Sequence, residues 1–234
     1  MVEDDATDLA MSDPAYRVAW GISSRIEHRW PASIAIIAAT GLYLSLPERY
    51  TIGPTWLVPI LELSILLPLS ISAPRRIPQE GRLQQILAIV LIAVVNVANL
   101  GSLARLVNML VWHGKELAGS ELLFSALRIW LTNVIVFALW YWEIDRGGPD
   151  QRAHAKHGCP DFLFPQMSTP GCSRLDWCPG FIDYFYLAFT NATAFSPTDA
   201  MPLTPQAKML MLAQSAISLV TITLVAARAV NILN

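Results

Sequence analysis

The chain has 234 residues, of which 54% are hydrophobic and 15% are charged, and its mean hydropathy is +0.44. This composition lies outside the usage of ordinary soluble domains and indicates an integral membrane protein. The net charge of −2 and the absence of a basic face or zinc-finger spacing in the sequence exclude a nucleic-acid-binding protein. The sequence contains no nucleophile elbow, phosphate-binding loop or pair of catalytic acids, so we expect no enzyme and no cofactor.

An N-terminal segment precedes two membrane regions, at residues 31–118 and 119–234. Residues 1–30 begin with an acidic stretch that lacks the positive region of a signal peptide, so we expect the first span to be retained. From Tyr16 to Trp30 this segment is either an interfacial amphipathic helix or an extension of the first span. Residues 31–118 hold three apolar runs, each near the roughly 20 residues of a spanning helix.

The predicted fold is all-α, with five transmembrane helices and one half-helix that enters and leaves the membrane on the same side. The third apolar run is longer than a bilayer requires, so it either tilts or leaves the membrane near Arg105. The fourth ends in Trp140-Tyr141-Trp142, an interfacial aromatic belt. The expected spans cover residues 31–46, 55–73, 83–112, 121–142 and 205–233, and the half-helix covers residues 181–193.

The C-terminal region resembles the pore module of potassium channels. The channel pattern T-T-V-G-Y-G-D-x-x-P-L-T aligns without a gap to Thr193, Ala194, Phe195, Ser196, Pro197, Thr198 and Asp199, then to Pro202, Leu203 and Thr204. The resemblance covers roughly residues 120–232 and implies an outer helix, a re-entrant pore helix, a loop and an inner helix. It also implies a homotetramer around the loops, because one loop cannot enclose a pore.

The residues aligned with the selectivity filter differ from the channel pattern in their chemistry. Ser196 and Thr198 replace the two glycines, and Pro197 replaces the tyrosine. Proline restricts the residue before it, and positive φ angles are costly for residues other than glycine, so a cage of four carbonyl layers is not expected. The hydroxyls of Thr193, Ser196 and Thr198, together with Asp199, are instead expected to line a wider polar constriction that passes a monovalent cation.

The chain is also similar to a bacterial membrane-protein family of uncharacterised function, whose members carry a D-x-x-Y-x-x-F-T…F-x-x-(T/S)-D segment. Asp183 to Thr190 and Phe195 to Asp199 fit this pattern. The similarity implies a multi-pass protein of the bacterial inner membrane, in contact with lipid. A cation channel with an altered filter is the first functional hypothesis. A non-conducting structural or regulatory protein with the same fold, or a proton-coupled transporter that uses Glu62, are the alternatives.

The charge distribution and the usual channel topology predict opposite orientations. With a cytoplasmic N-terminus, most basic loop residues lie inside and only Arg49, Lys115 and Arg228 lie outside, as the positive-inside rule requires. Four spans before the loop then return the chain to the cytoplasm, so the pore mouth opens inward, opposite to a potassium channel. We favour this inverted orientation; an external N-terminus or a miscounted third run are the alternatives.

Three charged residues lie within the predicted spans. Glu62 lies near the middle of the second span, Arg128 lies at similar depth in the fourth, and Arg105 is shallower. A structural ion pair between Glu62 and Arg128 is favoured over a proton or ion relay. Asn96, Asn99 and Asn133 are expected to make interhelical hydrogen bonds.

The connection at residues 143–180 holds all three cysteines of the chain. His154 and His157 precede Cys159, but the spacing departs from compact zinc patterns, so no metal site is expected. Cys172 and Cys178 are the plausible disulfide if the loop faces an oxidising compartment, and all three residues are thiols if it faces the cytoplasm.

Acidic residues follow the aromatic belt of the fourth span and recur around the half-helix. For Glu143, Asp145 and Arg146 we favour a salt-bridged cap on the fourth span. The alternative is a cation-attracting vestibule that Glu143 and Asp145 form together with Asp183 and Asp199.

Overall fold

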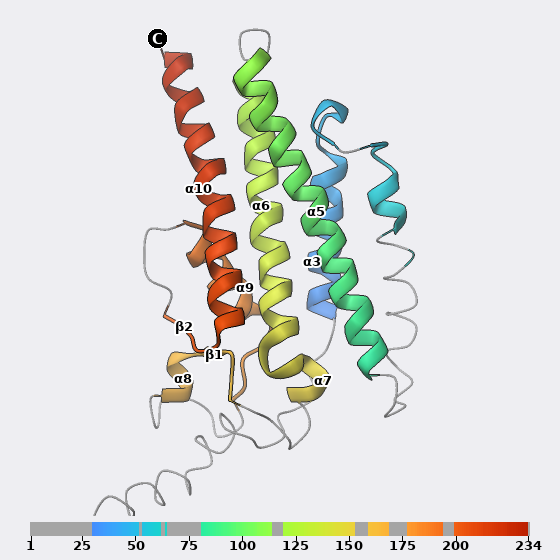
Figure 1. Cartoon of the computed structure of the whole chain (residues 1–234), viewed down its shortest axis with the longest axis vertical. Coiled ribbons are helices and arrows are strands. Elements are labelled where there is room, and N and C mark those ends of the chain that lie inside the picture. Colours follow the sequence, from blue (N-terminus) through green and yellow to red (C-terminus); the bar gives the residue numbers. More distant parts are fainter. Residues whose placement is uncertain are drawn as a thin grey trace, which may run out of the picture.

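The computed structural model describes residues 30–51, 53–61, 64, 81–113, 119–152, 159–168, 177–193 and 199–233. Within these residues the chain is mostly helical (Figure 1). Three helices are long and apolar enough to cross a membrane, over Gln85–Trp112, Gly119–Gly147 and Pro205–Ala227. The labelled elements are α3 (Trp30–Leu44), η1 (Glu48–Tyr50), α5 (Gly81–His113), α6 (Gly119–Ile144), η2 (Asp145–Gly147), α7 (Pro149–Arg152), β1 (Phe162–Leu163), α8 (Pro165–Ser168), α9 (Phe181–Thr193), β2 (Met201–Pro202) and α10 (Pro205–Leu233).

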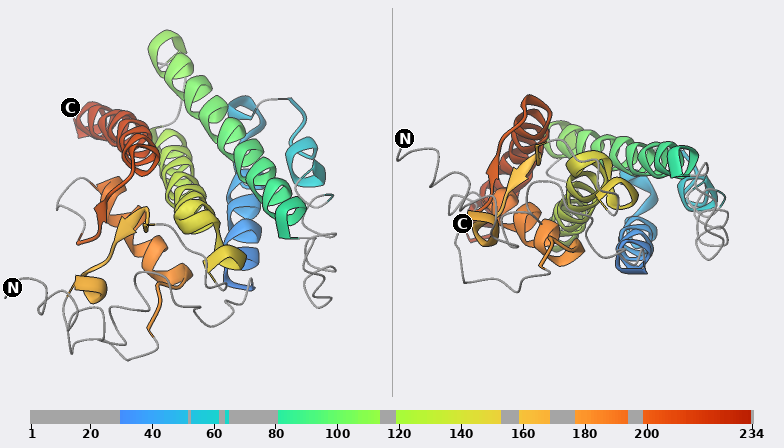
Figure 2. Two further views of the ribbon diagram at one scale, coloured as in Figure 1. Left: turned by 60° about the horizontal axis from the view of Figure 1, so that its bottom comes forward. Right: turned by 90° about the horizontal axis from the view of Figure 1, so that it is seen from below.

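Helix α6 is the central element of the bundle. It packs against α3, α5, α9 and α10, and the view from below shows these helices around it (Figure 2). Of the most apolar stretch of α6, 61% is buried, compared with 44% for α5 and 17% for α10. The core therefore lies around α6, whereas α10 presents most of its surface to the surroundings.

Helix α3 packs on α6 through a face of small residues. Ala32, Ala35, Ala39 and Tyr43 are buried at helical spacing, and small side chains let two helix backbones approach closely. With 15 residues, α3 is shorter than the other apolar helices. It ends at Leu44, two residues before the predicted end of the first span, and the chain turns there towards Pro47.

Helix α5 continues without a break through Arg105, whose side chain is exposed. At 1.5 Å per residue, its 33 residues extend about 50 Å, well beyond the roughly 30 Å of a bilayer core. Figure 1 shows α5 inclined to α6. The inclination agrees with the tilt that the length of the third apolar run predicts.

The upper end of the bundle in Figure 1 is joined by a surface ion pair. The Arg49 Nε atom lies 3.2 Å from Glu121 Oε1 and connects η1 to the first turn of α6. Next to this pair, burial and the negative charge of Glu121 raise the pKa of the Tyr50 hydroxyl, against a smaller opposing effect of Arg49. The Tyr50 phenol therefore stays protonated at physiological pH.

Two of the predicted elements lie largely outside the described residues. They are the amphipathic segment that begins at Tyr16 and the second span at residues 55–73. Of the second span, residues 55–61 and 64 are described, and of these 57–61 and 64 are helical.

Candidate functional site

Helix α9 forms where an aromatic, apolar run follows a capping signal. Gly180 precedes the first helical residue, and its backbone N–H donates to Asp183 Oδ2 at 2.8 Å. An acidic side chain at the third helical position that accepts from the N-cap N–H is half of a capping box. It also places negative charge at the positive end of the helix dipole. The helix spans Phe181–Thr193, as the sequence predicts.

The two faces of α9 differ sharply in exposure. Tyr184, Leu187, Ala188 and Ala192 are buried at spacings of three and four residues, and this face packs against α6 and α10. On the opposite face Ile182, Phe185, Tyr186 and Phe189 are exposed. The helix is therefore fixed on one side and apolar but uncovered on the other.

A polar cluster fixes the last turn of α9 between α6 and α10. The Asn191 Nδ2 atom donates to Gln214 Oε1 at 2.7 Å and to the Met211 carbonyl at 3.0 Å. The Tyr141 hydroxyl donates to the same Gln214 oxygen at 2.5 Å, and Gln214 Nε2 donates to the Ala188 carbonyl at 2.8 Å. We call Tyr141, Asn191 and Gln214 the polar cluster.

Asn133, on α6, joins the same side of α10 through a hydrogen bond of its own. Its Nδ2 atom donates to Ser218 Oγ at 2.9 Å. This bond confirms the interhelical role predicted for Asn133. Asn99 is buried, and the buried Oδ1 atom of Asn96 has no hydrogen-bond partner within the described part of the chain.

The lower junction, where α6 ends, centres on Asp145. This carboxylate is fully buried and accepts hydrogen bonds from the Asp161 backbone N–H at 2.8 Å, the Tyr184 hydroxyl at 2.5 Å and Arg146 Nε at 3.2 Å. Arg146 adopts a left-handed backbone conformation, with φ of 53°. At Gly148, φ is 93°, and an added Cβ would lie 3.0 Å from the Glu143 carbonyl oxygen. The chain therefore reverses sharply beneath α6.

Asp161 connects this junction to the start of α10. Its carboxylate accepts from the Arg146 backbone N–H at 2.9 Å and from the Thr204 hydroxyl at 2.6 Å. Thr204 caps α10, because its Oγ1 atom also accepts from the Ala207 N–H at 3.3 Å, and Pro205 occupies the first helical position. The short strands β1 and β2 pair antiparallel beside it, Phe162 with Pro202 and Leu163 with Met201.

Aromatic side chains and one buried arginine fill the space between the lower junction and the polar cluster. The Phe162 ring lies 5.1 Å from the ring of Tyr141 and 6.4 Å from that of Tyr184. Arg152 is fully buried; it donates to the Trp142 carbonyl at 2.7 Å and lies 5.3 Å from the Tyr184 ring centroid. The two polar sites therefore belong to one packed unit.

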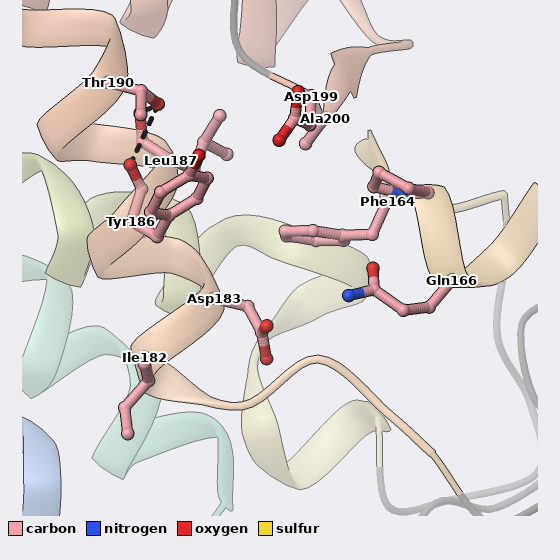
Figure 3. A pocket seen from close by; sticks show the side chains of 10 residues that line it. Phe164, Gln166, Ile182, Asp183, Tyr186, Leu187, Thr190, Asp199 and Ala200 are labelled. Carbon is pink, nitrogen blue, oxygen red and sulfur yellow. Dashed lines mark hydrogen bonds between the residues drawn. The ribbon is translucent and has the colours of Figure 1, made fainter. Parts of the chain in front are cut away.

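A pocket of about 250 Å³ opens on the exposed side of α9 (Figure 3). Asp183 and Asp199 line it from opposite sides, with Gln166, Tyr186 and Phe164 between them. The ten described residues that line it include no lysine or arginine. This pocket is therefore acidic on part of its wall and aromatic on the rest.

The predicted vestibule divides into two separate places. Glu143 and Asp145 are fully buried in the lower junction, and the Asp145–Arg146 ion pair at 3.2 Å confirms the predicted salt-bridged cap for these two residues. Only Asp183 and Asp199 share a pocket. A vestibule of all four carboxylates is therefore wrong, because Glu143 and Asp145 are fully buried inside the fold.

Of the residues aligned with the filter, Thr193 and Asp199 are described. The Thr193 hydroxyl donates to the Thr190 carbonyl at 2.9 Å, and Asp199 is exposed. The other five, residues 194–198, lie outside the described residues.

The remaining candidate residues fall in different places. Glu62 lies outside the described residues, so its pairing with Arg128 stays a prediction; Arg128 is half-buried in α6. Cys172 also lies outside them, whereas Cys178 is half-buried and Cys159 is an exposed thiol. His154 and His157 are likewise outside the described residues.

Sequence reasoning did not identify the polar cluster or the role of Asp161. Asn191 and Gln214 are polar residues inside apolar helices, and this is the signal from which the cluster was predictable. Asp161 lies in an irregular segment, where no periodicity marks it. Comparison with protein-family models, with curated proteins and with solved structures found no match to this chain.

Proposed function

We propose that this protein is a cation-channel-like membrane protein, in which α9, residues 194–198 and α10 form a pore module with a non-glycine filter. The proposal rests on one observation, the position of α9 beside only the first part of α10. Tyr184 and Thr204 contact the same lower junction, whereas Asn191 contacts Gln214. Gln214 lies nine residues beyond the start of α10, which is about 14 Å along the helix.

This geometry supports a re-entrant half-helix. Helix α9 and helix α10 both begin at one end of the bundle, and the last turn of α9 lies about half of a bilayer core away from that end. The C-terminal carbonyls of α9 then point towards the middle of the membrane, where their partial negative charge favours a cation. The acidic pocket of Asp183 and Asp199 adds further attraction at the entry.

Exposed small residues on α10 support self-assembly of the protein. We propose that the assembly is a homotetramer. Ala213, Ala216, Thr223 and Ala227 are exposed on the side of α10 away from the buried Gln214, on one stripe that also carries the exposed Val220. The neighbouring exposed stripe carries the large side chains of Leu212, Leu219 and Ile222. Small residues typically mark helix contacts in membranes, so the small stripe suits a second copy and the large stripe suits lipid.

The distribution of basic residues supports an inverted orientation in the bacterial inner membrane. Arg82, Arg146 and Lys208 belong to the end of the bundle where α9 begins, and Arg49 and Arg228 belong to the other end (Figure 1). The positive-inside rule then places the start of α9 on the cytoplasmic side.

Cation flux into liposomes that carry the purified protein tests the function. We expect monovalent cation flux above that of protein-free liposomes, and we expect Phe195→Gly/Pro197→Gly to change its selectivity. Leu212→Ala/Leu219→Ala, on the proposed lipid-facing stripe, is the control and should leave the selectivity unchanged. Unchanged flux together with unchanged selectivity in the loop variant excludes the loop as the path. Absence of flux in the wild type favours a non-conducting structural or regulatory protein.

A further inference from the structure

The polar cluster of Tyr141, Asn191 and Gln214 has a feature that apolar packing lacks, because its donors and acceptors fit in only one arrangement. The Asn191 NH₂ group donates to the Met211 carbonyl and to Gln214 Oε1, so the Gln214 atom must be the amide oxygen, and it also accepts from the Tyr141 hydroxyl. The amide nitrogen is thereby directed to the Ala188 carbonyl, with which it forms a 2.8 Å hydrogen bond. Rotating the amide would bring its NH₂ group against the NH₂ group of Asn191 and its oxygen against the Ala188 carbonyl.

The cluster holds α9 at both its backbone and its side chains. Gln214 binds the Ala188 carbonyl, and Asn191 binds the Met211 carbonyl at 3.0 Å. The Ser215 hydroxyl donates to Asn191 Oδ1 at 3.1 Å. Asn191 lies in the last turn of α9, two residues before the helix ends at Thr193. The position of that end is therefore set jointly by α6 and α10.

The neighbouring helix α10 is the least buried of the three candidate spans, at 17%. A shift of α10 along or about its axis displaces Gln214 and Ser215 relative to α6. Because these residues bind Asn191, the last turn of α9 moves with them or the hydrogen bonds break. The cluster thus mechanically links α10 to the start of residues 194–198.

We infer that Asn191 and Gln214 are positioning residues that fix the C-terminal end of α9 against α6 and α10 and so determine which cations pass the segment that follows. The inference rests on the proposed channel function for its cation selectivity. The positional part stands on the hydrogen bonds alone. Neither residue is required to touch the ion.

The first test measures the ratio of fluxes of a small and a large monovalent cation in liposomes. Asn191→Ala and Gln214→Ala should each change this ratio by roughly threefold to tenfold, the effect of losing one buried hydrogen bond. The double variant should change it no more than either single variant, because the two residues act as one unit. Ser218→Ala is the matched control: it removes a buried α6–α10 hydrogen bond that does not involve α9.

The second test needs no flux and measures amide hydrogen exchange in the peptide that covers residues 189–199. Asn191→Ala should accelerate exchange there, and Ser218→Ala should not. Unchanged exchange in Asn191→Ala, or an equal change in Ser218→Ala, overturns the positioning role. An exchange change in a protein without cation flux keeps the positioning role and rejects the channel function, so the two failures are distinguishable.

Discussion

Asp145 shows how much of the fold depends on one buried carboxylate. Three groups from different parts of the chain donate to it: the Asp161 backbone, the Tyr184 hydroxyl and the Arg146 side chain. Its side chain and that of Arg146 are 0% and 2% exposed. Each charge therefore depends on the other for its stability inside the protein.

Replacing Asp145 by alanine should destabilise the protein strongly. We expect a loss of about 3–5 kcal/mol, because the Arg146 guanidinium is left buried without its carboxylate. Glu121→Ala is the control, since the Arg49–Glu121 ion pair is partly exposed and such pairs contribute about 1 kcal/mol or less. The free energy of unfolding of each variant is measured in mixed detergent micelles and compared with that of the wild type. Equal losses in the two variants contradict the role given to Asp145.

Only the local part of this junction was predictable from the sequence. The Asp145–Arg146 pair was predicted because the two residues are adjacent and follow the aromatic belt. Tyr184 and Asp161 join it from 39 and 16 residues away, and no local pattern encodes that approach.

At the level of elements, the helices follow their sequence signals closely. Thr204-Pro205 is a strong start signal, and α10 begins there. Residues 181–193 form α9 because the apolar side chains recur at helical spacing after a capping glycine. The pairing of β1 with β2 was not predicted, because each strand has two residues and their partners are about 40 residues apart.

The small stripe of α10 gives a prediction for the assembly. Ala216→Phe should weaken self-association at least on the order of tenfold, because overpacking a close helix contact costs about 1–3 kcal/mol. Native mass spectrometry or cross-linking in mild detergent measures the assembly. Leu219→Phe, on the large-residue stripe, should leave it unchanged. Dissociation by Leu219→Phe and not by Ala216→Phe would place the contact on the large-residue stripe and contradict the proposed assembly face.

At the level of the whole molecule, the exposed thiol of Cys159 reports the orientation. This residue precedes β1, at the end of the bundle where α9 begins. A membrane-impermeant maleimide should label it in opened cells and not in intact ones, if this end is cytoplasmic. Cys159→Ser identifies the labelling that is due to the other cysteines. Labelling of Cys159 in intact cells would reverse the proposed orientation.

The lower junction and the polar cluster together have a consequence for the variability of the loop. Thr193 belongs to a helix that is held by Asn191, and Asp199 precedes a strand that is paired with β1. Both ends of the connection are thus held by contacts within the described part of the chain. Substitutions within residues 194–198 should therefore leave the contacts that hold α9 and β2 in place, so this stretch can be exchanged for another sequence while the supporting scaffold stays the same.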